Sequence, residues 1–374
     1  MPLLDKVIDF RHELHANPEP SMRETETRVR IQQFLQENTT NLKIVEKDRW
    51  LYALHDEGSE ETYLFRADFD AILNEDGSSY HGCGHDGHTA ILAGLAATLD
   101  GETLGRNIVF LFQHAEETGE GAIETVSVIE ETGVDKAFAL HGFSGIPLGE
   151  LRFRPGINFC ASTGFKVKLK GVQSHASQPE KGINPAYLMS ELTLLLQPLS
   201  EYNGFEPIKW HDRQFENLVM TTVVYQRLGE KAFGVSPSTA ELGLTLRAYY
   251  EKDIDQLIES IANFVETESS KRNIQCDFEQ LERFPETKSD HNLTEAIQPL
   301  LDEWGFQWAI EQQAYRGSED FGHLANLVPS VYFSLGLGED HPPGHSTEFE
   351  FVDEAIQYGI RLFEQIARHG VDAN

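Results

Sequence analysis

Apolar residues follow two different patterns along this chain and divide it into three stretches. Before about residue 162, and again after about residue 286, they recur at helical spacing or form short unbroken runs. Unbroken runs are typical of strands in a parallel sheet that is covered on both faces. The pattern there predicts helices at about residues 3–16, 24–36, 90–97, 121–132, 292–304 and 352–368, and buried strands at 63–67, 107–112, 136–140 and 330–335.

The middle stretch instead alternates, with Phe165, Val167 and Leu169 separated by lysines, which indicates a strand with one wet face. Its elements follow the order strand, helix, strand, strand, helix, strand, which is typical of a ferredoxin-like domain with both helices on one face of an antiparallel sheet. After the first strand, these elements are expected at about residues 184–199, 218–225, 240–247, 254–267 and 276–281.

The two patterns together predict two domains, the number expected for a chain of 374 residues. Residues 1–161 and 287–374 are expected to form an α/β domain of three layers around a mostly parallel sheet. Residues 162–286 are expected to form a ferredoxin-like α+β domain inserted into it.

Polar residues follow three successive buried strands. Asp68 and Asp70 follow the first strand, Glu116 and Glu117 the second, and His141 the third. The carboxyl ends of parallel strands meet at one edge of a sheet, where open α/β sheets place their chemistry. One histidine after a strand is usually structural, but three such coincidences favour one shared site.

The densest polar motif is H-G-C-G-H-D-G-H-T at residues 81–89. Thiolate, imidazole and carboxylate are the ligand types of zinc and its first-row neighbours. Cys83 and His85 are two positions apart, so in an extended segment their side chains leave the same face. A histidine-rich surface loop beside a buried cysteine is the alternative, but such loops rarely combine these residue types so densely.

The net charge and the cysteine content indicate which partners and which cellular compartment to expect. The 61 acidic residues against 30 basic ones give a net charge of −31, which disfavours nucleic acid and anionic membranes as partners. No apolar run approaches the roughly 20 residues of a membrane-spanning helix. The three cysteines form no disulfide framework, and the polar start does not resemble a signal peptide, so we expect a cytoplasmic protein.

The strand ends and the cluster together supply enough ligands for two metal ions. Two-metal hydrolytic sites hold their ions about 3.5–4 Å apart with a shared water. Adjacent residues of an extended chain point in opposite directions, so one of the paired glutamates is expected to bind metal while the other takes a proton. The candidate residues are Cys83, His85, Glu116, Glu117, His141 and either His341 or His345.

In this order and spacing the motifs resemble the metal-dependent amidohydrolases of the aminoacylase/carboxypeptidase superfamily. That group includes indole-acetyl-amino-acid hydrolases, hippurate hydrolases and N-acetyl-diaminopimelate deacetylases. The resemblance covers nearly the whole chain. It is carried by R-H-E-L-H at residues 11–15, Pro18-Glu19, E-T-E-T at 24–27, R-A-D-F-D-A at 66–71, the 81–89 cluster, H-A-E-E at 114–117, S-E-D-F at 318–321, and His345-Ser346 with Phe349.

The resemblance implies a dinuclear enzyme that hydrolyses N-acyl amino acids or related small amides. Cys83, as thiolate, would bridge the metals, and Glu116 would be the base that activates the bridging water and then protonates the leaving amine. His345 is preferred to His341 because Ser follows it directly and Phe three residues later. The implied metal ligands are Cys83, His85, Glu117, His141 and His345. Manganese or zinc is expected, with cobalt or nickel as alternatives.

Three further residues acquire roles from the resemblance. Asp70 would orient a ligand histidine. Asp86 would either do the same or cap the helix. His175 would supply a donor for the oxyanion in the active site of a partner subunit, which implies a homodimer formed through a lid and dimerisation domain at residues 162–286; an ordinary surface histidine is the alternative.

The chain also departs from the family pattern. Gly234 stands where an asparagine usually holds the substrate, His114 stands where proline is common, and the loop between Ala71 and His81 is short and acidic. These departures leave the substrate open. A dipeptidase or carboxypeptidase is the nearest rival, and a catalytically silent paralogue is another that the presence of Glu116 argues against. A structural single-zinc site would not need so many ligands.

Overall fold

The structure is a computed structural model and describes residues 1–74, 76–211 and 213–372. It divides into two compact units, the first being Met1–Asn158, Thr287–Ala314 and Asp320–Asn374, the second Phe159–Glu286 and Tyr315–Glu319. The second unit therefore takes in residues 159–161 and 315–319, which the sequence pattern placed in the first. The reason lies in the backbone, since the N–H of Cys160 donates to the carbonyls of Tyr315 and Gly317, both at 3.1 Å.

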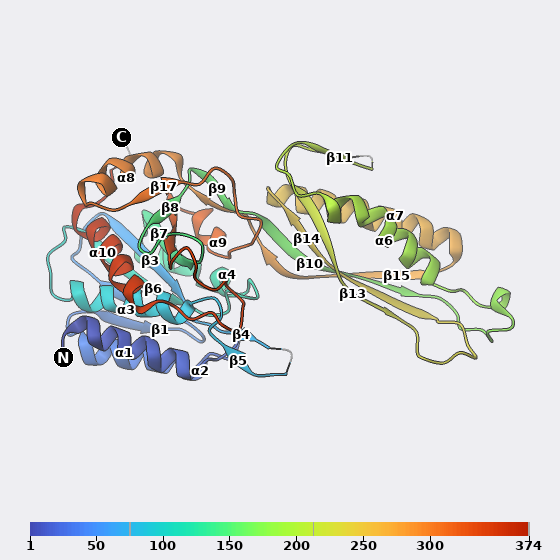
Figure 1. Ribbon diagram of the computed structural model, residues 1–374, viewed down its shortest axis with the longest axis horizontal. Coiled ribbons are helices and arrows are strands. Elements are labelled where there is room, and N and C mark those ends of the chain that lie inside the picture. The colour runs from blue at the N-terminus through green and yellow to red at the C-terminus, as the bar shows by residue number, and fades with distance from the viewer. Residues whose placement is uncertain (75, 212, 373–374) are drawn as a thin grey trace. The chain divides into compact units, whose positions relative to one another are not determined.

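A sheet of eight strands forms the centre of the first unit (Figure 1). Strand β3 pairs in parallel with β6 and β7, and β7 with β18, whereas β1 and β2 run antiparallel at one edge. Every residue of β3, β6 and β18 is buried, as expected for strands covered on both faces. Across the sheet the strands are β1 (Lys43–Glu46), β2 (Leu51–His55), β6 (Asn107–Gln113), β3 (Thr62–Asp68), β7 (Lys136–Phe143), β18 (Ser330–Gly336), β8 (Leu151–Phe153) and β17 (Trp308–Ile310).

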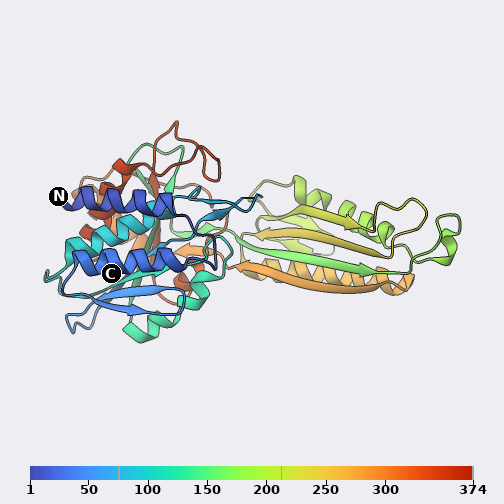
Figure 2. The ribbon, with the colours of Figure 1, turned by 90° about the horizontal axis from the view of Figure 1, so that it is seen from below.

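One apolar helix, α3, fills the space between this sheet and other helices. All of its residues from Ala90 to Ala96 are buried, and α1 and α10 pack against it (Figures 1 and 2). The approach is close at Gly94, where an added Cβ would lie 3.0 Å from Val7 of α1. The helices of this unit are α1 (Leu3–Ala16), α2 (Thr25–Asn38), α3 (His85–Leu99), α4 (Gly121–Thr125), α5 (Ser127–Thr132), α8 (His291–Glu303), α9 (Gly322–Ala325) and α10 (Asp353–His369).

Two elements of the first unit differ from the prediction in ways that affect the site. The single helix expected at 121–132 is two short helices, α4 and α5, which are separated at Val126. Strand β7 continues past its expected end at residue 140, because His141 pairs with Ser334 of β18. His141 thus lies within a strand and not after it. Strands β4 (Ile72–Leu73), β5 (Ser79–Tyr80), β9 (Gly156–Phe159) and β16 (Thr287–Ser289) were too short to be read from the pattern.

The second unit is a ferredoxin-like α+β domain. Its antiparallel sheet has the strand order β13-β14-β10-β15, which the connections β10-α6-β13-β14-α7-β15 produce. Buried residues of both helices pack with the alternate residues Phe165, Val167 and Leu169. A hairpin of β11 (Ile208–Trp210) and β12 (Arg213–Phe215) was not predicted. The main elements are β10 (Ala161–Lys170), η1 (Pro179–Lys181), α6 (Ala186–Glu201), β13 (Val219–Leu228), β14 (Thr239–Ala248), α7 (Glu251–Arg272) and β15 (Gln275–Phe284).

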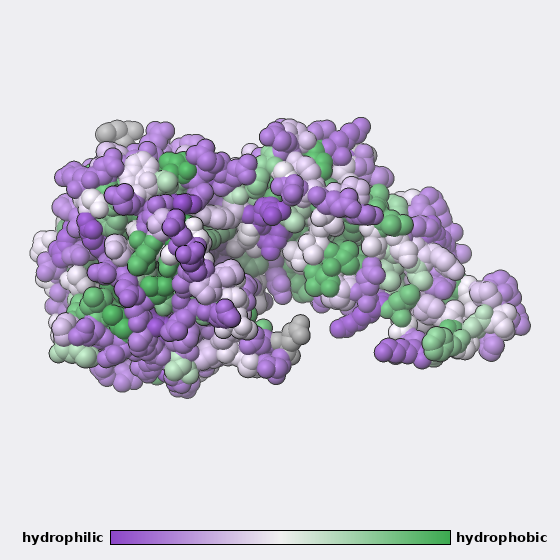
Figure 3. Space-filling view, in the orientation of Figure 1, coloured by the Kyte–Doolittle hydropathy of each residue, from purple (hydrophilic) through white to green (hydrophobic). Residues whose placement is uncertain are grey.

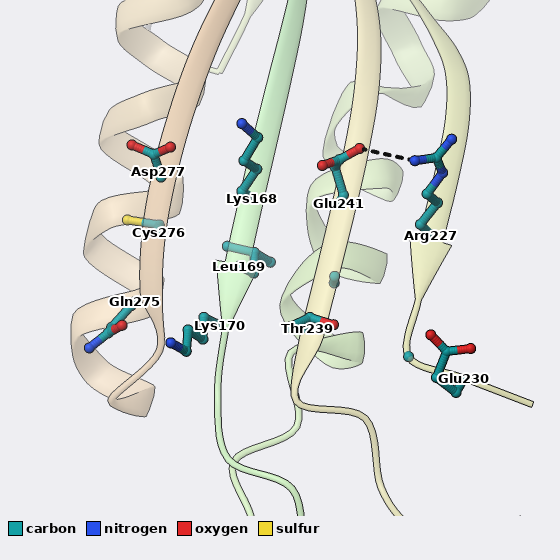
Figure 4. Close-up of a pocket in the computed structure, with 12 residues that line it drawn as sticks. Lys168, Leu169, Lys170, Arg227, Glu230, Thr239, Glu241, Gln275, Cys276 and Asp277 are labelled. Atoms are coloured by element: carbon teal, nitrogen blue, oxygen red, sulfur yellow. Dashed lines mark ion pairs between the residues drawn. The ribbon is translucent and has the colours of Figure 1, made fainter. Parts of the chain in front are cut away.

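The wet face of this sheet carries paired charges. A pocket of about 580 Å³ lies at one end of the sheet, and Figure 4 shows its lining on all four strands. Lys168 donates to Glu279 at 2.6 Å, and Arg227 lies 4.0 Å from Glu241. Alternation of lysine with apolar residues therefore reflects a solvated, ion-paired surface. Among the helices that the structure describes, none combines the length and apolar character that a bilayer crossing requires.

Candidate metal centre

The junction between residues 81–84 and helix α3 brings the first ligands together. His85 is the first residue of α3, so the extended segment that the sequence suggested for Cys83 and His85 is wrong. Gly84 sits between them with φ 87°, a left-handed conformation that glycine adopts without steric cost. The turn at Gly84 nevertheless places Cys83 and His85 in one group of ligand atoms with His141.

Cys83 belongs to two groups of ligand atoms at once. One group joins it to His85 and His141, the other to Glu117 and His345, and within each group the atoms lie within 4.8 Å of one another. Sγ of Cys83 is 3.3 Å from Nε2 of His141, and Nε2 of His345 is 3.7 Å from a Glu117 oxygen. A ligand shared by two adjacent groups is the arrangement that a bridging thiolate requires.

Nδ1 of each histidine in the first group faces an acceptor oxygen, which suits metal binding through Nε2. Nδ1 of His85 lies 3.0 Å from Oδ1 of Asp70, and Nδ1 of His141 lies 2.8 Å from the carbonyl of Gly142. When each Nδ1 donates its proton to these oxygens, each Nε2 keeps its lone pair for a ligand. Nε2 of His85 is buried and has no hydrogen-bond partner within the described part of the chain.

The electrostatics of the cluster favour a bound cation. Burial, followed by the Glu117 carboxylate, raises the pKa of the Cys83 thiol well above its usual value. Burial also raises the pKa of Glu117 to about 7 and lowers that of His141 well below its usual value. One oxygen of Glu117 is buried without a hydrogen-bond partner among the described residues. A divalent cation would satisfy these atoms and stabilise the thiolate and carboxylate, so the residues fit a metal site.

His345 and His341 differ clearly in their surroundings. The backbone N–H of His345 donates to the carbonyl of Gly82 at 2.7 Å, and its own carbonyl accepts from the hydroxyl of Tyr80 at 2.8 Å. These bonds attach the loop to the segment before Cys83. His341 instead places Nδ1 2.9 Å from Oγ of Ser144 and Nε2 2.9 Å from the carbonyl of Glu350. Both nitrogens of His341 are thus engaged elsewhere, and only His345 joins a ligand group.

Glu116 and Glu117 lie in a turn that follows Ala115, which has φ 50°. The expectation that an extended chain would separate their side chains therefore does not apply. Both glutamates form a group of possible ligand atoms with His85. The N–H of Glu117 donates to Oδ2 of Asp70 at 3.0 Å, so one aspartate contacts both Glu117 and His85.

His88 and Arg66 lie near the proposed ligands, and neither had a role in the sequence interpretation. Nδ1 of His88 lies 2.7 Å from Oδ1 of Asp68, and Nε2 of His88 accepts from the N–H of Gly142 at 2.8 Å. Nε2 of His88 thus holds the backbone beside His141, while Asp68 fixes the orientation of its ring through Nδ1. Arg66 in turn pairs with Asp68 at 2.7 Å. The spacing of His88 three residues after His85, on one helix face, was the available signal.

Asp86 has neither of the roles expected for it. Its Oδ2 accepts from Nδ1 of His15 at 2.8 Å and lies 3.5 Å from Nη1 of Arg11. The cap position of α3 is Gly84, and no side chain caps it. Asp86 therefore connects α3 to α1.

The remaining sequence candidates lie outside this cluster. His175 is an exposed residue of the second unit whose Nδ1 is 2.7 Å from Oγ of Ser177. Gly234 is close to it in the same unit, since its carbonyl accepts from Ala176 at 2.9 Å. His114 is buried in the first unit, 3.2 Å from Glu124. The role of His175 stays a prediction.

Comparison with known proteins identifies relatives over nearly the full length. A model described as "Peptidase family M20/M25/M40" matches residues 55–369. IAA-amino acid hydrolase ILR1-like 4 of Arabidopsis thaliana is 28% identical, over 97% of this chain and 85% of that protein. N-acetylcysteine deacetylase of Bacillus subtilis strain 168 is 25% identical, over 96% of each chain.

Solved structures have the same fold. The YXEP protein of Bacillus subtilis, described as a dinuclear metal binding peptidase from the M20 family, aligns with a TM-score of 0.79 at 21% identity, covering 100% of this chain and 99% of that one. The aminobenzoyl-glutamate utilization protein of Klebsiella pneumoniae aligns with a TM-score of 0.74 at 20% identity, covering 98% and 95%. These similarities extend over nearly the full length of the chain and show the fold alone.

Proposed function

The chain belongs to peptidase family M20/M25/M40 and is a metal-dependent hydrolase of amide bonds, and we propose that its substrates are N-acyl amino acids. The relatives named for their substrates, an IAA-amino acid hydrolase and an N-acetylcysteine deacetylase, both cleave such compounds according to their names. The observation that carries the assignment as a two-metal hydrolase is the position of Cys83 in two adjacent groups of ligand atoms, with Glu116 beside them.

We assign the metal ligands as Cys83, His85, Glu117, His141 and His345. When bound, two divalent ions would polarise the amide carbonyl and lower the pKa of water toward about 7. Manganese and zinc both suit this mixed thiolate, imidazole and carboxylate set, and cobalt and nickel tolerate it.

Glu116 carries out the proton transfer in this proposal. It removes a proton from the attacking water, and it returns a proton to the leaving amine when the C–N bond breaks. Its carboxyl is largely buried and lies beside the proposed ligands His85 and Glu117, where the attacking water would stand. Asp70 orients His85 through Nδ1 and holds the backbone of Glu117.

The first experiment is metal analysis combined with a substrate panel. We expect about two metals per chain, the number in a dinuclear hydrolytic site, and release of amine from N-acetyl or N-benzoyl amino acids. Faster cleavage of dipeptides would instead assign the chain to dipeptidases or carboxypeptidases. Metal binding without turnover of any compound would contradict hydrolysis and favour a silent paralogue, with Gly234 and the short loop at 71–81 as the first positions to examine.

We further propose a cytoplasmic homodimer formed through the second unit. All three cysteines are free thiols, which suits a reducing compartment. Apolar side chains reach the surface of this unit, where Figure 3 shows hydrophobic patches on the face in view. Tyr187 and Leu194 of α6 are 70% and 67% exposed, and Val224 of β13 is 60% exposed. Helix α6 packs on β13, an edge strand, so both elements carry exposed apolar residues that a second copy would cover.

His175 provides a functional test of that dimer. His175→Ala is expected to lower kcat while the protein stays dimeric, because the proposed oxyanion donor is removed. If the histidine acts in the partner's active site, mixing this variant with Glu116→Gln should produce hybrid dimers that recover activity. Recovery would be measured as turnover after subunit exchange. If both variants lose activity and the mixture recovers none, the result would contradict sharing of active sites between subunits.

A further inference from the structure

Glu24 makes a contact with the turn that carries Glu116 and Glu117. It precedes helix α2, and its side chain is almost entirely buried. Oε1 of Glu24 accepts a hydrogen bond from the N–H of Ala115 at 2.8 Å. Ala115 is the residue directly before the two glutamates, and it is fully buried. The contact thus joins the N-terminal part of the chain to the loop after β6.

Ala115 needs such a contact because of its backbone conformation. Its φ of 50° is left-handed, a region that residues with a Cβ rarely adopt unless their surroundings impose it. The carbonyl of Ala115 accepts from the N–H of Gly121 at 3.1 Å, which closes the turn on the other side. Glu24 and Gly121 therefore hold the N–H and the carbonyl of the same residue, Ala115, and the direction of the next two side chains depends on its conformation.

The surroundings of Glu24 disfavour the charged form of its buried carboxyl group. Burial, and then the carboxylate of Asp70, raises the pKa of Glu24 to about 7, while the N–H groups of Glu24 itself, Ala115 and Met22 act in the opposite direction. A buried acidic group that costs stability and contacts the backbone of a functional turn is better explained by positioning than by stability.

We propose that Glu24 is a positioning residue that holds Ala115 in its left-handed conformation and thereby directs Glu117 to the metals and Glu116 to the substrate. This inference rests on the proposed function, which assigns Glu117 as a ligand. It gives the E-T-E-T motif at residues 24–27 a specific task, carried by its first residue. Glu24 acts through Ala115 and does not itself touch metal or substrate.

The test is zinc affinity of the metal-free protein, measured by competition with a chelating indicator, together with kcat. Glu24→Ala is expected to weaken zinc binding by about 10–100-fold, the usual effect of removing a group that orients a ligand. Adding Ala115→Gly to this variant should recover most of the affinity, because glycine adopts the left-handed conformation without help. A folded Glu24→Ala variant with native zinc affinity and kcat would overturn the proposal, as would a double variant that recovers neither.

Matched variants separate positioning from loss of stability. Glu19→Ala removes a carboxylate in the same segment that accepts from the N–H of Thr27 at 2.6 Å, so it should lower the melting temperature without weakening zinc binding. Glu24→Gln keeps an acceptor oxygen for Ala115 and should bind zinc more tightly than Glu24→Ala; equal loss in both would contradict the proposal even if Glu24→Ala folds poorly. Glu117→Ala distinguishes failure of the ligand assignment from failure of the role proposed for Glu24. Native zinc affinity in Glu117→Ala would refute the assignment of Glu117 as a ligand. Weakened zinc binding in Glu117→Ala together with native zinc binding in Glu24→Ala would refute only the role of Glu24.

Discussion

Glu116→Gln is expected to lower kcat for amide hydrolysis by about 10²–10⁴-fold, the range that general acid–base catalysis contributes. The amide keeps the shape of the side chain but cannot accept a proton from water. Glu116 is 7% exposed and forms a group with His85 and Glu117, so its carboxyl is placed beside the ligands. Because it is not assigned as a ligand, the metal content should equal that of the native protein. Steady-state kinetics and elemental analysis on the same sample test both parts.

Glu120→Gln is the matched control for this experiment. Glu120 lies in the same loop, but it is exposed, and its carboxylate accepts from the hydroxyl of Thr118 at 3.1 Å. The control should therefore keep native kcat. Native kcat in Glu116→Gln would remove Glu116 as the base. Loss of metal together with activity would instead make Glu116 a ligand and would require a different proton carrier.

The long elements of the fold could be predicted because their patterns extend over many residues. The helix expected at 3–16 is α1, with the same bounds, and the alternating middle stretch is an antiparallel sheet. Strand β1 was missed because its four residues are only half-buried or exposed and carry no clear pattern. The separation of α4 from α5 at Val126 was also missed, since helical spacing continues across it.

The location of the site could be predicted from the order of the parallel strands. Polar residues at or beyond the carboxyl ends of β3 and β6 come together with His141, near the end of β7, because these parallel strands share an edge. Tertiary contacts decide the rest. Asp86 pairs with residues of α1 about 70 positions earlier in the chain, and Ala115 depends on Glu24 in the same way. No local sequence pattern predicts these tertiary partners or the left-handed backbone conformation of Ala115.

Cys83→Ala is expected to remove most of both metal ions, because Sγ of Cys83 belongs to both groups of ligand atoms. Bound metal stabilises a protein by roughly 2.7 kcal/mol at a free concentration 100 times Kd, so native protein should melt at a clearly higher temperature with zinc than without. The variant should lose most of that difference. Elemental analysis after dialysis, together with melting curves with and without zinc, measures both effects. Cys276→Ala, which changes a half-buried thiol of the second unit, should leave metal content unchanged.

Comparison of Cys83→Ala with His345→Ala tests whether the Cys83 thiolate bridges the two metal ions. Nε2 of His345 belongs to only one of the two groups, so His345→Ala should release one ion and retain the other. Loss of both ions in Cys83→Ala with loss of one in His345→Ala is the pattern that a shared thiolate produces. If both variants lose a single ion, the thiol serves one metal alone. In that case the second ion must depend on carboxylate oxygens of Glu116 and Glu117, which share a group with His85, and Glu116 could no longer act as a base separate from the metals.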